Sequence, residues 1–159
     1  MTIQINQRIP AATLSVSKGD TRATLSTDDV FKGRKVVLFA VPGAFTPICS
    51  EQHLPGFVKH FDDFHKRGID VLCMAVNDTF VMNAWAKSQQ APQGLAMLAD
   101  GNGEFTRALG LEMDATRFGM GLRCQRFALY AEDGVVKKLA VEAPGEFKVS
   151  SAQAVLASL

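Results

Sequence analysis

Two continuous apolar segments that enclose a helical pattern constrain the fold of this chain more than any other feature. Residues 35–41 (KVVLFAV) and 69–76 (IDVLCMAV) lack the alternation of a half-exposed strand, so each is predicted to be a strand covered on both faces. Between them, apolar residues recur at helical spacing over about 18 residues, and Gly68 is suited to end that helix. A strand, a helix and a strand in this order predict a βαβ unit with parallel strands and a right-handed crossover.

Other patterns complete an α/β sheet around this unit. An N-terminal β-hairpin is predicted where segments 13–17 and 21–26 flank a glycine turn, and a second where 125–131 and 135–141 flank Asp133-Gly134. The remaining predicted elements are a helix capped by Asp78 that ends before Pro92, a strand at 95–98, a helix at 103–109, and a terminal helix at 152–159 capped by Ser150 or Ser151. This order indicates a thioredoxin-like layout, with a mixed central sheet and helices on both faces.

Size and charge narrow the possible partners. The chain has 159 residues, 47% of them apolar, so we expect one domain over residues 1–159 with a substantial core. Its net charge of +1, with the signs interspersed, provides no basic field for nucleic acid or anionic lipid. No apolar run reaches the roughly 18 residues that a membrane helix needs. We therefore expect neither nucleic acid nor a membrane as a partner.

The three cysteines indicate free thiols. Cys49, Cys73 and Cys124 form no C-x-x-C pair and no cluster with zinc-ligand spacing, so no metal is expected. The N-terminal residues lack both the basic stretch and the apolar stretch of a secretory signal. An odd number of thiols without an export signal predicts a reducing compartment, the cytoplasm.

The loop that follows the first buried strand is the strongest candidate for a reactive site. Open α/β sheets place ligands beyond the carboxyl ends of their strands, and Cys49 falls there, at the start of the long helix. The unpaired N–H groups of a helix start favour a thiolate, which is the nucleophilic form of cysteine. Thr46 can bring a hydroxyl beside the sulfur, as donor and acceptor. Pro55 is expected to kink the helix and to leave the turn around Cys49 able to unwind.

The other thiols and the histidines are expected to be structural. Cys73 lies within an apolar strand and is predicted to be buried and inert. Cys124 begins a strand, where we expect partial exposure and no catalytic part. His53 lies one helical turn after Cys49, yet apolar neighbours favour a histidine hydrogen-bonded for structure. His60 and His65 are predicted to lie at the surface.

The same loop carries a family resemblance. The pattern Pro42-x-x-x-Thr46-x-x-Cys49 resembles the peroxidatic motif of the peroxiredoxins. The longer string VPGAFTP-x-CS-x-x-HLPGF at 41–57 is similar to the type II (five-like, atypical) subfamily. The resemblance extends over almost the whole chain, through segments 71–85, 100–104, 121–127 and 145–151.

This resemblance implies a thiol-dependent peroxidase active in antioxidant defence. Cys49 would attack one peroxide oxygen and become a sulfenic acid. Thr46 would hydrogen-bond the attacked oxygen, Pro42 would shield the pocket from water, and backbone N–H groups near Gly43 and Cys49 would hold the departing oxygen. The implied substrate-binding set is Gly43, Phe45, Thr46 and Cys49. No cofactor is implied, and the substrates would be hydrogen peroxide and alkyl hydroperoxides.

Arg126 corresponds to the family's active-site arginine, because it precedes the aromatic Phe127 on the strand after the third helix. A fixed guanidinium suits this chemistry, since negative charge develops on the oxygen that leaves. Arg123 and Arg107 could compete for the same role.

The resemblance leaves the reductant open. Some five-like members carry a resolving cysteine before the last helix, but residues 147–151 here contain no thiol. Cys73 matches a second cysteine of many type II members, yet its strand position makes a direct bond to Cys49 doubtful, because Cα atoms more than about 7 Å apart cannot be bridged without backbone movement. We therefore favour glutathione or glutaredoxin as reductant, with thioredoxin next. Type II members also suggest a homodimer, packed through Phe45 and the segment around Phe80.

Three alternatives use the same residues differently. A thioredoxin-like binding or chaperone module would keep the fold with an inert Cys49. A Cys–His hydrolase would pair Cys49 with His53, but a base one turn along the same helix is poorly placed for an acyl group, and no orienting carboxylate follows. Metal binding by Cys49, His53 and Cys73 is the weakest of the three.

Overall fold

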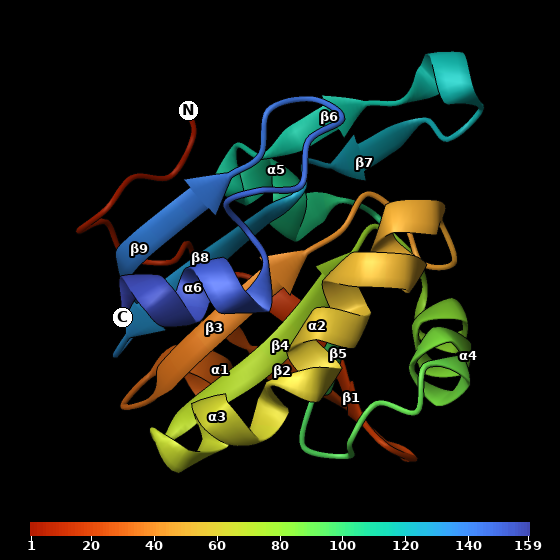
Figure 1. The fold of residues 1–159 in the computed structure, drawn as a ribbon. Helices are drawn as coiled ribbons and strands as arrows, with labels where there is room; N and C mark the ends of the chain where they lie inside the picture. Colours follow the sequence, from red (N-terminus) through yellow and green to blue (C-terminus); the bar gives the residue numbers. More distant parts are fainter.

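The computed structural model describes all 159 residues and contains a seven-stranded mixed sheet and a small two-stranded one (Figure 1). The order in the large sheet is β2-β1-β5-β4-β3-β8-β9. Its strands are β1 (Thr13–Lys18), β2 (Thr21–Ser26), β3 (Lys35–Ala40), β4 (Ile69–Ala75), β5 (Ala96–Ala99), β8 (Phe127–Glu132) and β9 (Val135–Val141), and the small sheet pairs β6 (Glu112–Asp114) with β7 (Leu122–Cys124). The helices are α1 (Thr27–Phe31), α2 (Leu54–Lys59), α3 (Phe61–Lys66), α4 (Thr79–Ser88), α5 (Glu104–Leu109) and α6 (Ala152–Ser158).

The centre of the sheet is the predicted βαβ unit. β3 and β4 are parallel, in a register that places Phe39 opposite Cys73. β5 continues the parallel arrangement on one side, and β8 runs antiparallel to β3 on the other. The two predicted hairpins are also present, as β1–β2 and β8–β9. This confirms the thioredoxin-like mixed sheet.

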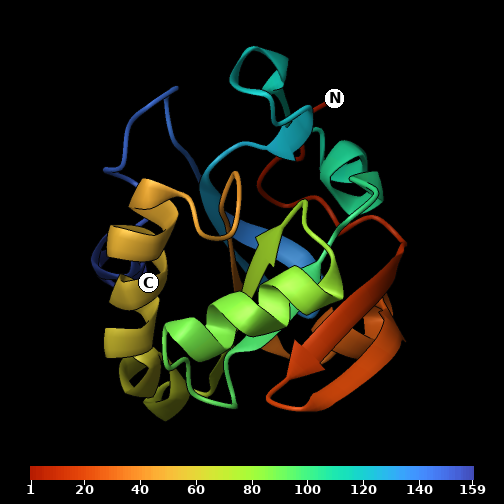
Figure 2. The same ribbon diagram turned by 90° about the vertical axis from the view of Figure 1, so that its right-hand side faces the viewer.

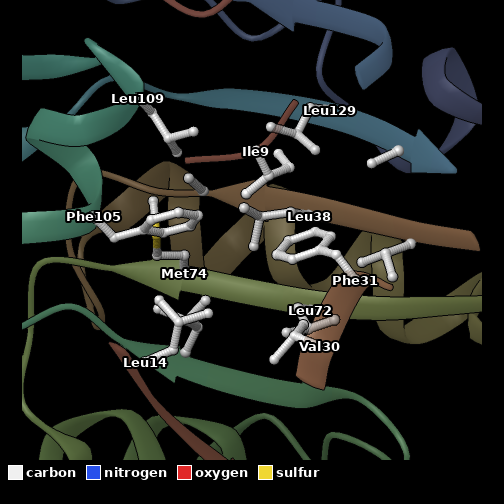
Figure 3. Close-up of a cluster of buried hydrophobic side chains, with 14 of the residues drawn as sticks. Ile9, Leu14, Val30, Phe31, Leu38, Leu72, Met74, Phe105, Leu109 and Leu129 are labelled. Atoms are coloured by element: carbon white, nitrogen blue, oxygen red, sulfur yellow. The ribbon is translucent and has the colours of Figure 1, made fainter. Parts of the chain in front are cut away.

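Helices cover both faces of the sheet, as its apolar central strands require. Alternate β3 residues point to opposite faces: Leu38 belongs to one core cluster, and Phe39 to the other. Figure 3 shows Leu38 among residues of α1 and α5, such as Phe31 and Phe105. On the other face, Phe39 lies in a cluster with residues of α2, α3, α4 and α6, whose arrangement Figure 2 shows from the side.

The single long helix expected after β3 is divided. A five-residue π-helix, Cys49–His53, comes first, and the N–H of Leu54 donates to the carbonyl of Cys49. α2 follows directly and ends at His60, where the backbone leaves helical geometry (φ −99°, ψ 10°) before α3 begins. Pro55 has no N–H to bond back along the helix, and the wide turn lies immediately before it. The π-helix therefore adjoins Pro55, the residue at which the sequence predicts a kink.

Two features of the fold were not expected. α1 is a five-residue helix with a capping box, in which Ser26 and Asp29 bond each other's backbone N–H groups. The β6–β7 pair fills the connection from α5 to β8. None of the helices is both long and apolar enough to span a membrane.

Candidate active site

Cys49 lies at the end of a loop that leaves the carboxyl end of β3. The helical path begins at Pro47, a residue suited to this place because the first N–H of a helix has no partner within it. The N–H of Ser50 donates to the carbonyl of Thr46 at 2.9 Å and closes the first turn. The Cys49 thiol is fully buried beneath this loop.

The sulfur nevertheless has a charged partner. Nη2 of Arg126 donates to Sγ of Cys49 at 3.0 Å. Arg126 immediately precedes β8, whose antiparallel register beside β3 pairs Phe127 with Ala40 and so brings the guanidinium to the Cys49 loop. A guanidinium in this position stabilises negative charge on the sulfur and on a group that departs from the atom the sulfur attacks.

The second terminal nitrogen of the same guanidinium contacts His53. Nη1 of Arg126 lies 2.9 Å from Nδ1 of His53, and Nε2 of His53 lies 2.9 Å from the carbonyl oxygen of Ser150. Because an arginine can only donate and a carbonyl can only accept, Nδ1 must be the acceptor and Nε2 must carry the proton. Burial, reinforced by the charge of Arg126, lowers the pKa of His53 to about 3, so the ring is neutral.

A buried carboxylate completes this side of the site. Glu142 accepts from the backbone N–H groups of Lys148, Val149 and Ser150 and from the Ser150 hydroxyl, at 2.7–2.9 Å. Burial opposes ionisation of Glu142, but these hydrogen bonds outweigh it and lower its pKa. Phe147, in the same segment, packs with its ring 5.0 Å from that of His53 and 5.9 Å from the Arg126 guanidinium.

The other candidate residues lie on the loop that precedes Cys49. Oγ1 of Thr46 donates to the carbonyl of Gly43 at 2.7 Å, so its lone pairs remain free to accept. A Cβ on Gly43 would lie 3.1 Å from Nη1 of Arg123 and 3.2 Å from the Thr46 methyl, so these side chains pack tightly against the loop. Phe45 has a left-handed backbone (φ 64°), and its ring is 55% exposed.

Of the three candidate arginines, Arg126 alone bonds Cys49. Arg123 donates from Nε to the carbonyl of Met120 at 2.9 Å and extends Nη1 toward the carbonyl of Pro42, at 3.5 Å. Arg107 is exposed on α5.

The remaining cysteines are free and fully buried. Burial raises the pKa of Cys73 well above its usual value and that of Cys124 to about 12, so both remain thiols at neutral pH. The expected partial exposure of Cys124 was wrong: its Sγ donates to the carbonyl of Val41 at 3.0 Å, because β7 brings it beneath the loop after β3.

Sequence reasoning missed two parts of this site. His53 is hydrogen-bonded within the structure, as expected, but it also contacts Arg126, and its spacing of four residues from Cys49 was the available signal. Glu142 and Phe147 gave no comparable signal, since their partners are far away in the chain.

Comparisons with known proteins agree with this geometry. The family described as Redoxin matches residues 4–156. Peroxiredoxin-2E-2, chloroplastic, of Oryza sativa subsp. japonica is 47% identical over an alignment that covers 99% of this chain and 73% of that protein. Peroxiredoxin-2D of Arabidopsis thaliana is 43% identical, with 99% and 98% covered.

A solved structure is equally similar. Reduced Prx3 of Vibrio vulnificus in complex with H₂O₂ has a TM-score of 0.92 and 49% identity, with 99% of each chain covered. These similarities set aside a purely structural or binding module. The chain belongs to the Redoxin family, as a peroxiredoxin related to the plant type II proteins, and is a thiol-dependent peroxidase.

Proposed function

We propose that Cys49 is the peroxidatic cysteine. Its thiolate attacks one oxygen of the hydroperoxide, the S–O bond forms as the O–O bond breaks, and a hydroxide or alkoxide leaves and takes up a proton. The sulfur is oxidised to a sulfenic acid, and the peroxide is reduced to water or an alcohol. The 3.0 Å hydrogen bond from Nη2 of Arg126 to Sγ of Cys49 carries this proposal, because it places a fixed positive charge at the reacting atom.

The loop residues have supporting roles in the same step. Thr46 accepts a hydrogen bond from the peroxide, since its own hydrogen already goes to the carbonyl of Gly43. Pro42 excludes water, and Gly43 lets the loop approach Thr46 and Arg123 closely. Phe45, on the loop between Gly43 and Thr46, is exposed and can contact a substrate that approaches this loop.

The proposed substrates are hydrogen peroxide and alkyl hydroperoxides. The solved relative from Vibrio vulnificus is described as a complex with H₂O₂. A small neutral substrate also suits a buried thiol whose guanidinium supplies the charge.

The proposed reductant is an external thiol, glutathione with glutaredoxin or else thioredoxin. Cys73 is held in the middle of the sheet, opposite Phe39, and its thiol is fully buried. Burial raises the pKa of Cys73 and keeps it a thiol, whereas attack on a sulfenic acid requires a thiolate. Attack by an external thiol requires only that the turn open.

We further propose a cytoplasmic homodimer. Phe45 and Phe80 are large apolar side chains that are 55% and 73% exposed, and they follow β3 and β4 respectively. Together they would give a second copy an apolar contact beside each active site.

Steady-state turnover of hydrogen peroxide tests the reaction and its reductant together. Wild type and the Cys49→Ser, Cys73→Ser and Cys124→Ser variants are compared with glutaredoxin plus glutathione and with thioredoxin. We expect no turnover by Cys49→Ser and near-wild-type turnover by the other two. Loss of turnover in a folded Cys73→Ser variant with every reductant would instead assign resolution to Cys73.

A further inference from the structure

A continuous chain of hydrogen bonds leads from a buried carboxylate to the reactive sulfur. Glu142 accepts from the N–H and hydroxyl of Ser150, and the Ser150 carbonyl is bonded by His53. His53 accepts from Arg126, which donates to Cys49. Each of these bonds is 2.7–3.0 Å long, and Glu142, Ser150, His53 and Cys49 are all buried.

The direction of each bond depends on the one before it. Arg126 fits against Cys49 only if Nδ1 of His53 is free to accept, and that requires the proton on Nε2. The proton stays on Nε2 because the Ser150 carbonyl is placed to accept it. The position of a single carbonyl therefore sets the orientation of the guanidinium.

That carbonyl belongs to the connection between β9 and α6. Residues 143–146 are exposed, whereas Phe147 is partly buried and Ser150 is buried. Glu142 fixes this segment at both ends. At the first end, its backbone N–H donates to the carbonyl of Arg126 at 2.9 Å. At the other end, its carboxylate accepts hydrogen bonds from three successive backbone N–H groups and one hydroxyl.

We propose that Glu142 is a positioning residue for the peroxidase reaction. It fixes the Phe147–Ser150 segment so that Ser150 holds His53 in the tautomer that orients Arg126 toward Cys49. This inference rests on the proposed role of Cys49, and it adds a residue that touches neither the sulfur nor the peroxide.

Oxidation and alkylation of the same thiol test the proposal together. In a background with Cys73→Ser and Cys124→Ser, the rate of Cys49 oxidation by hydrogen peroxide is compared with its alkylation by iodoacetamide. Arg126 assists the oxygen that leaves a peroxide more than it assists alkylation. We therefore expect Glu142→Gln to lower the oxidation rate about tenfold, and alkylation less than about threefold.

Two neighbouring serines provide the matched control. Ser150→Ala removes a donor to Glu142, whereas Ser151→Ala removes only the cap on Ala154 of α6. We expect Ser150→Ala to slow oxidation about threefold, and Ser151→Ala to lower the thermal midpoint while leaving oxidation unchanged.

The possible results distinguish a failure of the Glu142 positioning role from a failure of the peroxidase function assigned to Cys49. A folded Glu142→Gln variant that is oxidised at the wild-type rate overturns the positioning role. If that variant does not fold, equal rates for Ser150→Ala and Ser151→Ala overturn it. Failure of the background protein itself to be oxidised at Cys49 overturns the assigned function, and the positioning role with it.

Discussion

Arg126 and His53 share a hydrogen bond, from Nη1 to Nδ1 at 2.9 Å, that only a neutral histidine can accept. If Nδ1 of His53 were protonated, two hydrogen-bond donors, Nδ1 and Nη1 of Arg126, would face each other beside Cys49. The bond therefore links the protonation of a buried ring to both the stability of the fold and the orientation of the catalytic guanidinium.

The stability of the protein should fall in mildly acidic solution because of His53. Its pKa is about 3 in the folded protein and 6.5 as an ordinary value, so between these the unfolded chain binds a proton that the folded chain does not. Stability is therefore complete above pH 6.5 and decreases as the pH falls toward 3. Between about pH 6 and 5, above the range of most carboxylates, we expect His53 to account for a loss of roughly 1 kcal/mol per pH unit.

Urea unfolding at several pH values measures this slope. The unfolding free energy of His53→Gln should depend less steeply on pH than that of wild type over this interval, by a slope equivalent to about one proton. His65→Gln, at an exposed position, should have the same slope as wild type. Equal slopes for His53→Gln and wild type would show that the ring does not stay neutral in the folded protein.

Replacing Arg126 by lysine should slow the oxidation of Cys49 even though the charge is kept. A lysine cannot bond Sγ of Cys49 and Nδ1 of His53 with the fixed fork that the guanidinium provides. We expect the second-order rate with hydrogen peroxide to fall at least about tenfold, or ~1.4 kcal/mol of barrier. Arg107→Lys, on exposed α5, should leave the rate unchanged. A rate for Arg126→Lys within about threefold of wild type, under ~0.7 kcal/mol, would show that the reaction does not need the fixed fork of the guanidinium.

The turn around Cys49 should open more readily than the helix that follows it. Pro55 offers no N–H to the residues of the π-helix, so Cys49–His53 is joined weakly to α2. Hydrogen exchange followed by mass spectrometry should show less protection at 49–53 than in α2. Pro55→Ala should increase that protection and slow attack by a thiol reductant on the oxidised sulfur, whereas Pro92→Ala, in a loop, should change neither. Equal protection on both sides of Pro55 would contradict local opening.

The single tryptophan should report this opening. Trp85 is fully buried in α4, and its Nε1 donates to the hydroxyl of Ser50, the residue after Cys49, at 3.0 Å. If the turn unwinds on oxidation, this bond breaks and the emission of Trp85 changes. In Ser50→Ala, where the bond is already absent, the change on adding peroxide should be smaller. An equal change in Trp85 emission in wild type and Ser50→Ala would show that the emission does not report the loss of the Ser50 hydrogen bond.

The succession of strands and helices along the chain and the position of the reactive loop could be predicted because their signals are local. The runs that became β3 and β4 are apolar throughout, and Asp78 marks the start of α4 by accepting from the N–H of Val81. The motif around Cys49 lies within one short segment. The exact form of its helix could not be predicted, because a π-turn has no composition of its own.

The support around the site depends on contacts between distant residues. His53 meets Ser150 across 97 positions, and Arg126 meets Cys49 across 77. Family resemblance supplied the second pair but gave no role to Ser150 or Glu142. Cys124 shows the same limitation: a strand start suggested exposure, but the short β6–β7 pair turns it inward against Val41.

Identification of the thiol that reacts first with peroxide is the most direct measurement. Reduced wild-type protein is treated with one equivalent of hydrogen peroxide in the presence of dimedone, and the modified peptide is located by mass spectrometry. We expect the adduct on Cys49 alone, and at most about a tenth as much after Arg126→Lys over the same short interval. An adduct on Cys73 or Cys124 while Cys49 remains unmodified would contradict the assignment.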